Sequence, residues 1–310
     1  MRPKSRRAVL RAASAGAAAG LAGCGIGGVG GIGDASPAEQ ARSHRDALSR
    51  FEDVARAIEE GYRMSTPYVR SGAGVMGLPF FNFEVPELDP ENPAVLFYDL
   101  LEDGTYELLG VEWLVPAEST DAPPTMFGRD LSGPTPGETA FIPEHYGLHA
   151  WLFAENPDGL FARYHAGVDP PSFIADLETA WDTFLPYYAN GAKAESEGGY
   201  TNTETCIATA EGGYGVPFAN TERVGTALRE PPILLYRLTS TWNYQLMGVE
   251  WYVPADSTDA PPTMFGRTFH DPEDGHSPDV DQGRHYGLHA WLFTANPRGL
   301  FAPYNPVIEC

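Results

Sequence analysis

The pattern of apolar and polar positions predicts that the folded part of the chain opens with a helix. Residues Pro37–Glu60 carry apolar side chains at helical spacing, among them Phe51 and Ile58. Ser36 is the expected N-cap, and Gly61 is the expected stop.

Strands are expected after this helix, and each expected element has a counterpart later in the chain. The second helical pattern covers Phe173–Ala194 and is interrupted near Pro186. β-Branched and aromatic runs bounded by Pro, Gly and Asp predict paired strands: Val95–Tyr98 with Ile233–Tyr236, Glu107–Val115 with Tyr244–Val253, and the two copies of HYGLHAWLF.

The chain contains an internal duplication. Residues 112–129 and 250–267 differ at two positions, and residues 145–164 and 285–304 differ at four. A repeat of this length predicts two tandem homologous units. The expected fold class is α+β, and each unit should be a small antiparallel sheet with one packed N-terminal helix and long loops.

The N-terminus has the features of an export signal with a lipid attachment site. Arg6 and Arg7 precede an alanine- and glycine-rich stretch that ends in Leu-Ala-Gly-Cys at Cys24. Paired arginines are typical of twin-arginine signals, and the Leu-Ala-Gly-Cys box is typical of lipoproteins, whose cysteine carries lipid. A transmembrane helix is the competing interpretation. However, the stretch contains Arg11 and is too short and weakly apolar to span a bilayer of roughly 30 Å.

The protein is therefore expected to be exported and anchored to the outer face of the cell membrane through lipid on Cys24. The glycine-rich residues that follow are expected to form a flexible tether. The four expected segments are a signal peptide at 1–23, the tether at 24–37, repeat unit 1 at 38–168 and repeat unit 2 at 169–310.

The charge balance narrows the classes of partner. The chain has 20 basic and 42 acidic residues, and five of the basic ones lie in the signal, which leaves a net charge of −27. A cationic partner is one interpretation. Adaptation to molar salt, where repulsion between carboxylates is screened over ~3 Å, is the other. The acids are scattered and Lys193 is the only lysine after the signal, which favours a halophile. Nucleic-acid binding is not expected because no basic stripe is present.

Two histidines recur at a fixed spacing in one expected strand. The alternation of a strand places His285 and His289 on one face, with Gly287 between them. The same spacing holds for His145 and His149. Because the histidines are four residues apart, they would also share one face of a helix.

A carboxylate is the expected third member of each group. Glu112 and Glu250 lie inside apolar strands, where an uncompensated acid is costly to bury. Two histidines and a carboxylate can bind a divalent metal ion, which predicts Glu250, His285 and His289 as ligands in the second copy, and Glu112, His145 and His149 in the first. In the structural alternative, Arg129 and Arg267 pair with the glutamates and the histidines bond to the backbone.

The second copy is expected to hold the richer site. His270 and His276 occur only there, whereas Ser132 and Glu138 stand at the corresponding positions of the first copy. His276 is therefore a fourth candidate ligand. The alternative is that these residues belong to a polar surface loop whose sequence has diverged between the copies.

Cys206 and Cys310 are expected to form a disulfide. Their counterparts in the first copy are Tyr68 and Pro170, so both cysteines are absent together, and an exported chain can keep a disulfide. Two unrelated free thiols are the alternative.

The motifs of the second copy resemble a family of exported bacterial and archaeal proteins that has no established activity. The resemblance rests on Gly-Val-Glu-Trp, Met-Phe-Gly, Gly-His, His-Tyr-Gly-Leu-His-Ala-Trp, Asn-Pro-Arg-Gly-Leu-Phe-Ala-Pro-Tyr-Asn-Pro and Cys310. It covers nearly all of both copies and implies location rather than reaction. The first copy departs from the pattern at His276 and at both cysteines.

The sequence favours a non-catalytic binding or envelope module, with a metal or small-ligand site in the second copy and a partner that the sequence does not specify. It contains no HExxH or GxSxG motif and no second acidic cluster retained in both copies. The alternative function is a metal-dependent extracellular hydrolase that uses Glu250, His276, His285 and His289.

Overall fold

The computed structural model describes residues 35–64, 66–84, 88–137, 142–241, 243–275, 277 and 279–310. The predicted signal peptide and Cys24 lie outside these residues. The fold is mixed α/β with mostly antiparallel sheets and few helices, which confirms the predicted class in this coarse form. Along the described part of the chain, no helix is both long enough and apolar enough to cross a membrane.

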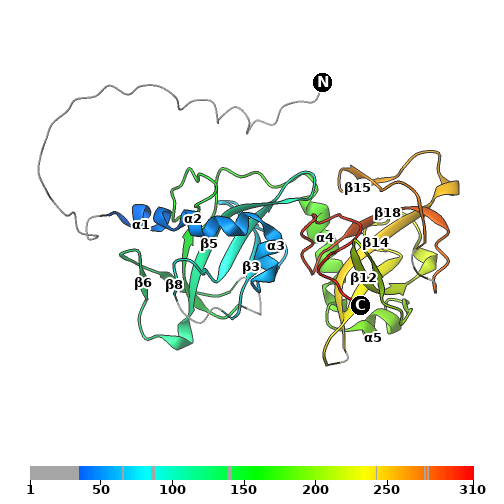
Figure 1. Ribbon diagram of the computed structural model, residues 1–310, viewed down its shortest axis with the longest axis horizontal. Helices are drawn as coiled ribbons and strands as arrows, with labels where there is room; N and C mark the ends of the chain where they lie inside the picture. Colours follow the sequence, from blue (N-terminus) through cyan, green and yellow to red (C-terminus); the bar gives the residue numbers. More distant parts are fainter. Residues whose placement is uncertain are drawn as a thin grey trace, which may run out of the picture. The chain divides into compact units, whose positions relative to one another are not determined.

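Within the described residues, two seven-stranded antiparallel sheets have the same strand order (Figure 1). The first has the order β1-β3-β4-β5-β9-β8, with β2 beside β3. Its strands are β1 Arg63–Met64, β2 Val69–Ser71, β3 Gly74–Phe81, β4 Val95–Leu100, β5 Tyr106–Pro116, β8 Ser132–Thr135 and β9 His145–Ala150.

The second sheet has the order β10-β12-β13-β14-β18-β17, with β11 beside β12. Its strands are β10 Thr201–Asn202, β11 Ile207–Thr209, β12 Gly212–Ala219, β13 Ile233–Leu238, β14 Tyr244–Pro254, β17 Glu273–Asp274 and β18 Arg284–Ala290. Two short ribbons complete the strands: β6 Thr125–Met126 with β7 Arg129–Asp130, and β15 Thr263–Met264 with β16 Arg267–Thr268.

The single N-terminal helix predicted from the sequence is divided into shorter segments. These are α1 Pro37–Ser43, α2 Arg45–Leu48, the 3-10 turn η2 Ser49–Glu52 and α3 Val54–Glu59. Ser36 caps α1 as predicted: its Oγ accepts from the Glu39 amide, and the Glu39 carboxylate accepts from the Ser36 amide. The break comes at Asp53, which is extended and accepts a bond from Ala55 N at 3.0 Å, so α3 begins with its own cap.

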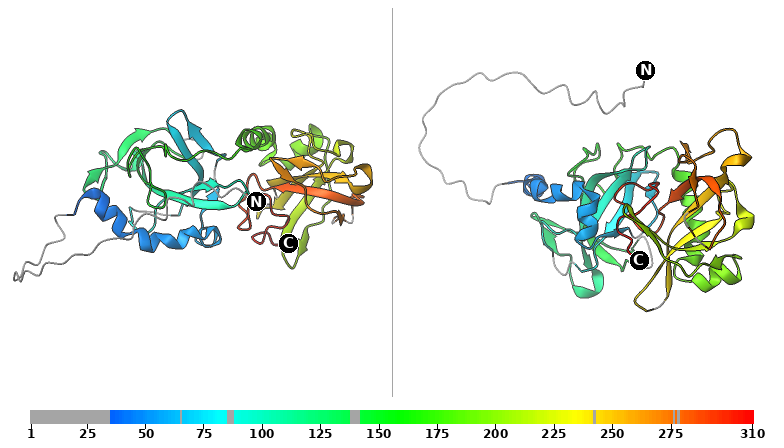
Figure 2. Two further views of the ribbon diagram at one scale, coloured as in Figure 1. Left: turned by 90° about the horizontal axis from the view of Figure 1, so that it is seen from above. Right: turned by 45° about the vertical axis from the view of Figure 1, so that its right-hand side comes forward.

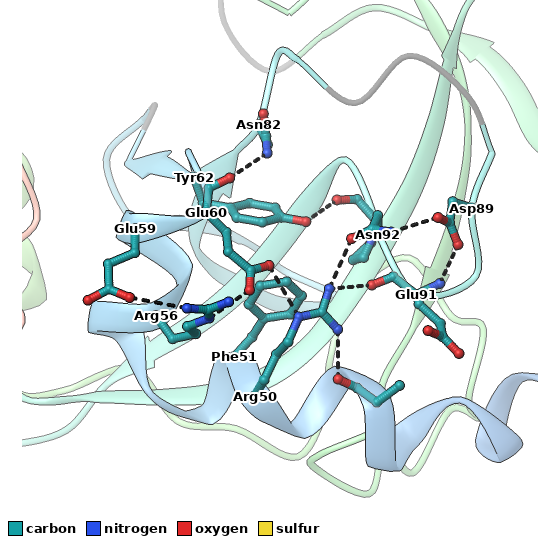
Figure 3. Close-up of polar contacts among 12 residues, drawn as sticks. Arg50, Phe51, Arg56, Glu59, Glu60, Tyr62, Asn82, Asp89, Glu91 and Asn92 are labelled. Atoms are coloured by element: carbon teal, nitrogen blue, oxygen red, sulfur yellow. Dashed lines mark hydrogen bonds and ion pairs between the residues drawn. The ribbon is translucent and has the colours of Figure 1, made fainter.

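These helices cover one face of the first sheet. In Figure 1 and in the left view of Figure 2, the blue helices run along the sheet that contains β3 and β5. Tyr98 of β4 donates from its hydroxyl to Phe51 O at 2.6 Å. Figure 3 shows that Arg50 links the same helical segment to the chain before β4, because its guanidinium donates to Glu91 O and to Asn92 Oδ1. It also donates to Glu60 Oε2 at the end of α3.

The helical segment of the second copy is also divided, near Pro186 as predicted. It consists of α4 Ile174–Phe184, the 3-10 turn η4 Leu185–Tyr187 and α5 Gly191–Ser196. Tyr236, the counterpart of Tyr98, donates to Tyr187 O at 3.0 Å, and the amide of Leu246 donates to Tyr188 O at 2.8 Å. Helical backbone therefore packs on one face of each sheet.

Strands β3 and β12 were not predicted because glycine and proline interrupt their apolar pattern. Gly77 in β3 has φ +83°, and a Cβ there would lie 2.2 Å from Tyr98 O. Gly215 in β12 has φ +81°, and a Cβ there would lie 2.3 Å from Tyr236 O. The glycines that weaken the sequence pattern are required where these strands approach their neighbours closely.

Candidate functional site: a buried glutamate between two histidines

On the face of each sheet opposite the helices, two histidines and one glutamate come together. In the second sheet Glu250 of β14 pairs in register with His289 of β18, and His285 lies four residues earlier on β18. In the first sheet Glu112 pairs with His149 in the same way. We call the first group (Glu112, His145, His149) the first-copy cluster and the second group (Glu250, His285, His289) the second-copy cluster.

Each carboxylate faces the Nε2 atoms of both its histidines. In the second-copy cluster, His285 Nε2 lies 3.5 Å from Glu250 Oε1, and His289 Nε2 lies 3.7 Å from Oε2. The corresponding distances to Glu112 in the first-copy cluster are 3.6 and 3.7 Å. The two imidazoles therefore offset the cost of burying the carboxylate in each cluster.

A glycine in the middle of each histidine strand makes this approach possible. A Cβ on Gly147 would lie 2.1 Å from Glu112 Oε1, so the carboxylate occupies the space that any other residue would fill. The fit is looser in the second copy, where a Cβ on Gly287 would lie 3.4 Å from Glu250 Oε1.

Backbone carbonyls orient one imidazole in each cluster. His145 Nδ1 lies 2.9 Å from Pro143 O, and His285 Nδ1 lies 3.0 Å from Gly283 O. A carbonyl can only accept, so Nδ1 carries the proton and Nε2 is the atom directed at the carboxylate.

The electrostatics of the clusters favour charged pairs. Burial lowers the pKa of His145 and His285, but the facing carboxylate outweighs burial and raises both pKa values overall. Burial alone would raise the pKa of Glu112. The charge of His149 and the interaction with His145 outweigh it, so the pKa of Glu112 is lowered.

The arginines proposed as structural partners of the glutamates have other contacts. Arg267 donates to Asp103 O at 2.8 Å and lies over the Phe301 ring at 4.3 Å. Arg129 lies over the Phe161 ring at 4.5 Å. The backbone bonds of the histidines do belong to the structural interpretation, but the partners of the carboxylates are imidazoles.

The predicted divalent metal ion remains a prediction. Across the described ranges, no set of three or more His, Cys, Asp or Glu side chains stands in an arrangement that would hold a metal ion. His276 and its first-copy counterpart Glu138 lie outside the described residues. His270 is described, and its Nε2 lies 3.1 Å from Phe301 O.

Of the two clusters, the first-copy cluster has the larger cavity beside it. A cavity of about 140 Å³ opens against Glu112, His145 and His149. Apolar side chains form most of its walls, and two hydroxyls and one guanidinium add polar groups. The other lining residues are Met76, Pro79, Phe81, Val95, Phe97, Leu114, Ser132, Thr135, Ile142, Gly147, Leu148, Phe161 and Arg163.

Two of these lining residues shape the polar end of the cavity. The Phe97 ring stacks on the His149 ring, with centroids 5.3 Å apart and planes 9° from parallel. Arg163 lines the same cavity as Glu112, His145 and His149.

Side chains of the second copy fill the corresponding space. The space that the described residues leave beside Glu250 has a volume of about 10 Å³, which is no more than a single water molecule needs. Tyr214 stands where the first copy has Met76, and its ring centroid lies 5.0 Å from that of His289. Tyr252 replaces Leu114 and lies 5.1 Å from the His285 ring.

A separate apolar group covers the second-copy cluster, and we call it the closing cluster. It contains Tyr214, Ala219, Ile233, Leu235, Met247, Tyr252, Val280, Trp291 and Ile308, with Ile207 and Tyr304 packed against it. The predicted disulfide is confirmed beside it: Cys206 and Cys310 are bonded, with Cα atoms 5.6 Å apart. The bond joins the residue before Ile207 to the segment that carries Ile308.

Comparison with family models, with curated proteins and with solved structures gives no match for this chain. The two clusters, and the difference in the space beside them, are the features of this chain from which a function can be inferred.

The sequence predicted the members of both clusters but not the cavity. Arg163 is one of the four differences between residues 145–164 and 285–304, where the second copy has Pro303. A second difference, Leu114 against Tyr252, also lies at the cavity. These two differences are sequence signals that could have pointed to the first copy, whereas Met76 lies in a strand that was not predicted.

Proposed function

We propose that the protein is a non-catalytic binding module, exported and anchored by lipid on Cys24, in a halophilic organism. In this proposal the chain consists of two tandem homologous units, and the first binds a small organic molecule. The observation that carries the proposal is the cavity of about 140 Å³ beside the first-copy cluster.

The cavity has the composition of a small-molecule site. Such sites are mostly apolar and contain a few polar groups that orient the ligand. Its volume is close to that of a cavity that accommodates benzene, roughly 150 Å³. The ligand should therefore place a group of about the size of one benzene ring between Met76, Phe97 and Phe161.

The arrangement of the first-copy cluster supports a binding function more than a hydrolytic one. Both Nε2 atoms approach the carboxylate of Glu112, an arrangement that stabilises a buried charge. A hydrolase would need a base directed at a nucleophile or at a metal-bound water. The metal-dependent alternative predicts about one equivalent of a divalent metal per chain, which elemental analysis of the purified protein would reveal.

The proposed tandem units are supported by the matching strand registers. Glu112 pairs with His149 as Glu250 pairs with His289. Tyr98 and Tyr236 each donate a hydrogen bond to a backbone carbonyl of the helical segment in their own copy. We infer that duplication produced both copies and that, among the described residues, the cluster of the first copy has the space for a ligand.

Filling the cavity with the side chain found in the other copy tests the binding proposal. A library of single-ring compounds is titrated by ligand-observed NMR against the wild type, Met76→Tyr and Met76→Leu. Wild type and Met76→Leu should bind members of the library, whereas Met76→Tyr should fold normally and lose binding. Binding that persists in Met76→Tyr, or an absence of any hit for the wild type, would contradict the proposal.

Lipid anchoring has its own test. Cys24→Ser should release the protein into the medium or leave an unprocessed precursor, because serine cannot accept the lipid. Fractionation of cells compares the variant with wild type, and a variant that stays in the membrane fraction in processed form would rule out attachment at Cys24.

A further inference from the structure

We propose that the disulfide between Cys206 and Cys310 is a thiol-sensitive latch, and that its reduction lets solvent reach the second-copy cluster. The bond joins the residue before β11 to the segment 303–310. In the oxidised protein these two segments cover the cluster, and in the reduced protein they move apart and uncover it. The inference concerns the second copy alone and does not depend on a ligand in the first.

A thiol in solution can reach the bond, because both cysteines are exposed. Its thiolate attacks one sulfur atom, which forms a mixed disulfide and releases the other cysteine as a thiol. A second molecule of thiol then displaces the first, so that the reagent is oxidised to its own disulfide and both cysteines are reduced. An oxidised small-molecule disulfide reverses these two steps and closes the latch.

The two joined segments are held to the rest of the second copy by local contacts. β11 has three residues, and its register with β12 shifts between Ile207 and Ala208. The segment 303–310 belongs to no helix or strand, although the structure describes all of its residues. A backbone bridge between Gly213 and Asn305 connects it to β12. Segments of this kind open at lower free energy than central strands do, so a covalent bond between them has a large effect on whether they stay in place.

These segments carry side chains that pack over the second-copy cluster. Ile207 lines the small space beside Glu250 together with Tyr214. Ile308 lies against the residue before Tyr214, because a Cβ on Gly213 would be 2.8 Å from Ile308 Cγ2. Both isoleucines pack with the closing cluster, so the disulfide ties together two parts of this cover.

Tyr214 connects the segment 303–310 to the imidazoles. Its ring centroid lies 5.0 Å from that of Tyr304 on one side and 5.0 Å from that of His289 on the other. If the segment leaves, Tyr214 loses the contacts that hold its ring against the imidazole. Reduction of the bond at the surface should therefore be followed by exposure of the buried histidines.

The first copy has the same cluster without a latch. Tyr68 and Pro170 stand in place of the two cysteines, and the Tyr68 hydroxyl donates to Asp99 at 2.6 Å. A cavity of about 140 Å³ lies beside that cluster, whereas the described residues of the second copy leave about 10 Å³. The disulfide thus occurs in the copy whose cluster is covered. This difference favours a role in covering the cluster, because the first copy forms the same sheet without the bond.

The experiment measures the reaction of single histidines with diethyl pyrocarbonate, which modifies imidazoles that solvent reaches. Three samples are compared at constant high salt: oxidised wild type, wild type reduced with dithiothreitol and freed of it without oxygen, and Cys206→Ser/Cys310→Ser. Peptide mass spectrometry follows each histidine of the two clusters. Reduction should raise the modification rates of His285 and His289 by roughly tenfold or more and leave those of the first-copy cluster unchanged.

The double variant is the matched control. It has no bond to reduce, so it should react at the rate of the reduced wild type whether or not dithiothreitol is added. Reoxidation of the wild type with oxidised glutathione should restore the low rates. Unchanged rates at His285 and His289, with loss of the disulfide verified by mass, would overturn the latch. Equal increases in both clusters would also overturn it, since reduction would then unfold the chain as a whole.

Discussion

The carboxylates of Glu112 and Glu250 are stable in their strands because two imidazoles face each of them. Glu250, His285 and His289 are 3, 0 and 1 % exposed, so water contributes little to their solvation. Removing one partner from a buried pair generally costs ~3–5 kcal/mol, because the other charge is left uncompensated. The clusters are therefore sites where single substitutions should have large effects on stability.

The first prediction concerns pH. The raised pKa of His145 stabilises the fold fully below the unfolded value of about 6.5, and this contribution is lost as pH rises through the folded pKa. The lowered pKa of Glu112 stabilises the fold above about 4.5, and this contribution is lost as pH falls through its folded pKa. Glu112→Gln should therefore be most destabilising between about pH 4.5 and 6.5.

Urea unfolding of wild type and Glu112→Gln, measured within this range and up to pH 9, gives the effect. The exposed Glu118 provides the control, and Glu118→Gln should follow the wild type at every pH. A constant difference between Glu112→Gln and wild type from pH 5 to pH 9 would show that the ion pairs do not contribute as described.

The second prediction uses the two glycines as a matched pair. Gly147→Ala places a methyl group 2.1 Å from Glu112 Oε1, so the carboxylate must leave its position between the histidines. Gly287→Ala places the methyl 3.4 Å from Glu250 Oε1, an ordinary contact. We expect Gly147→Ala to lower the unfolding free energy by ~1–3 kcal/mol, as overpacking does, and Gly287→Ala to cost less. Equal losses in denaturant unfolding would contradict this account.

Strand periodicity explains why the clusters could be predicted from sequence and the cavity could not. A two-residue alternation is enough to place His285, Gly287 and His289 on one face, and burial of an acid is enough to suggest Glu250 as their partner. Whether space remains beside the cluster depends on which side chains arrive from other strands. The smaller Met76 leaves space in the first copy, whereas Tyr214 fills it in the second. Both residues lie in strands that the sequence pattern did not predict.

At the scale of elements, local signals decide where helices and strands begin and end. The cap at Ser36 and the break near Pro186 follow from single residues and were predictable. The break at Asp53 was not, because the apolar period continues across it while its side chain caps the next helix. Tertiary packing, rather than local preference, keeps these short helical segments in place.

The third prediction concerns the disulfide, which joins residues 104 positions apart. The first copy has Tyr68 in place of Cys206, and its hydroxyl donates to the buried Asp99 at 2.6 Å. Replacing both cysteines with serine should destabilise the protein by roughly 4–5 kcal/mol on the loop-entropy estimate.

Thermal unfolding of Cys206→Ser/Cys310→Ser with and without reductant measures this contribution. The wild type in reductant should approach the variant, and the variant itself should not respond. Binding to the first-copy cavity should persist in the variant, because no residue that lines this cavity belongs to the closing cluster. An unchanged transition temperature would show that the bond adds no stability.

At the scale of the whole molecule, charge is the dominant property. The full chain has a formal net charge of −22, and the described residues carry acidic groups on both copies. Repulsion of this magnitude opposes folding unless salt screens it. The fold class followed from the sequence because strand patterns recur in both copies. The expected salt requirement is a prediction from composition alone.

The fourth prediction is that the protein requires high salt to stay folded. Because screening extends only ~3 Å in 1 M salt but ~10 Å at 0.1 M, repulsion among the carboxylates should rise on dilution. The thermal transition measured by circular dichroism should fall between molar and 0.1 M potassium chloride. A neutral osmolyte at equal osmolality should not restore it. A transition temperature independent of salt would count against halophilic adaptation.

The closed space beside Glu250 determines the valency of the molecule. Two copies of a ligand site in one chain would give two equivalents at saturation and would allow one occupied copy to influence the other. If the first copy binds a ligand as proposed, the cavity of about 140 Å³ there and the space of about 10 Å³ described beside Glu250 predict a monovalent receptor. Its titration should end at one equivalent per chain and follow a simple hyperbola.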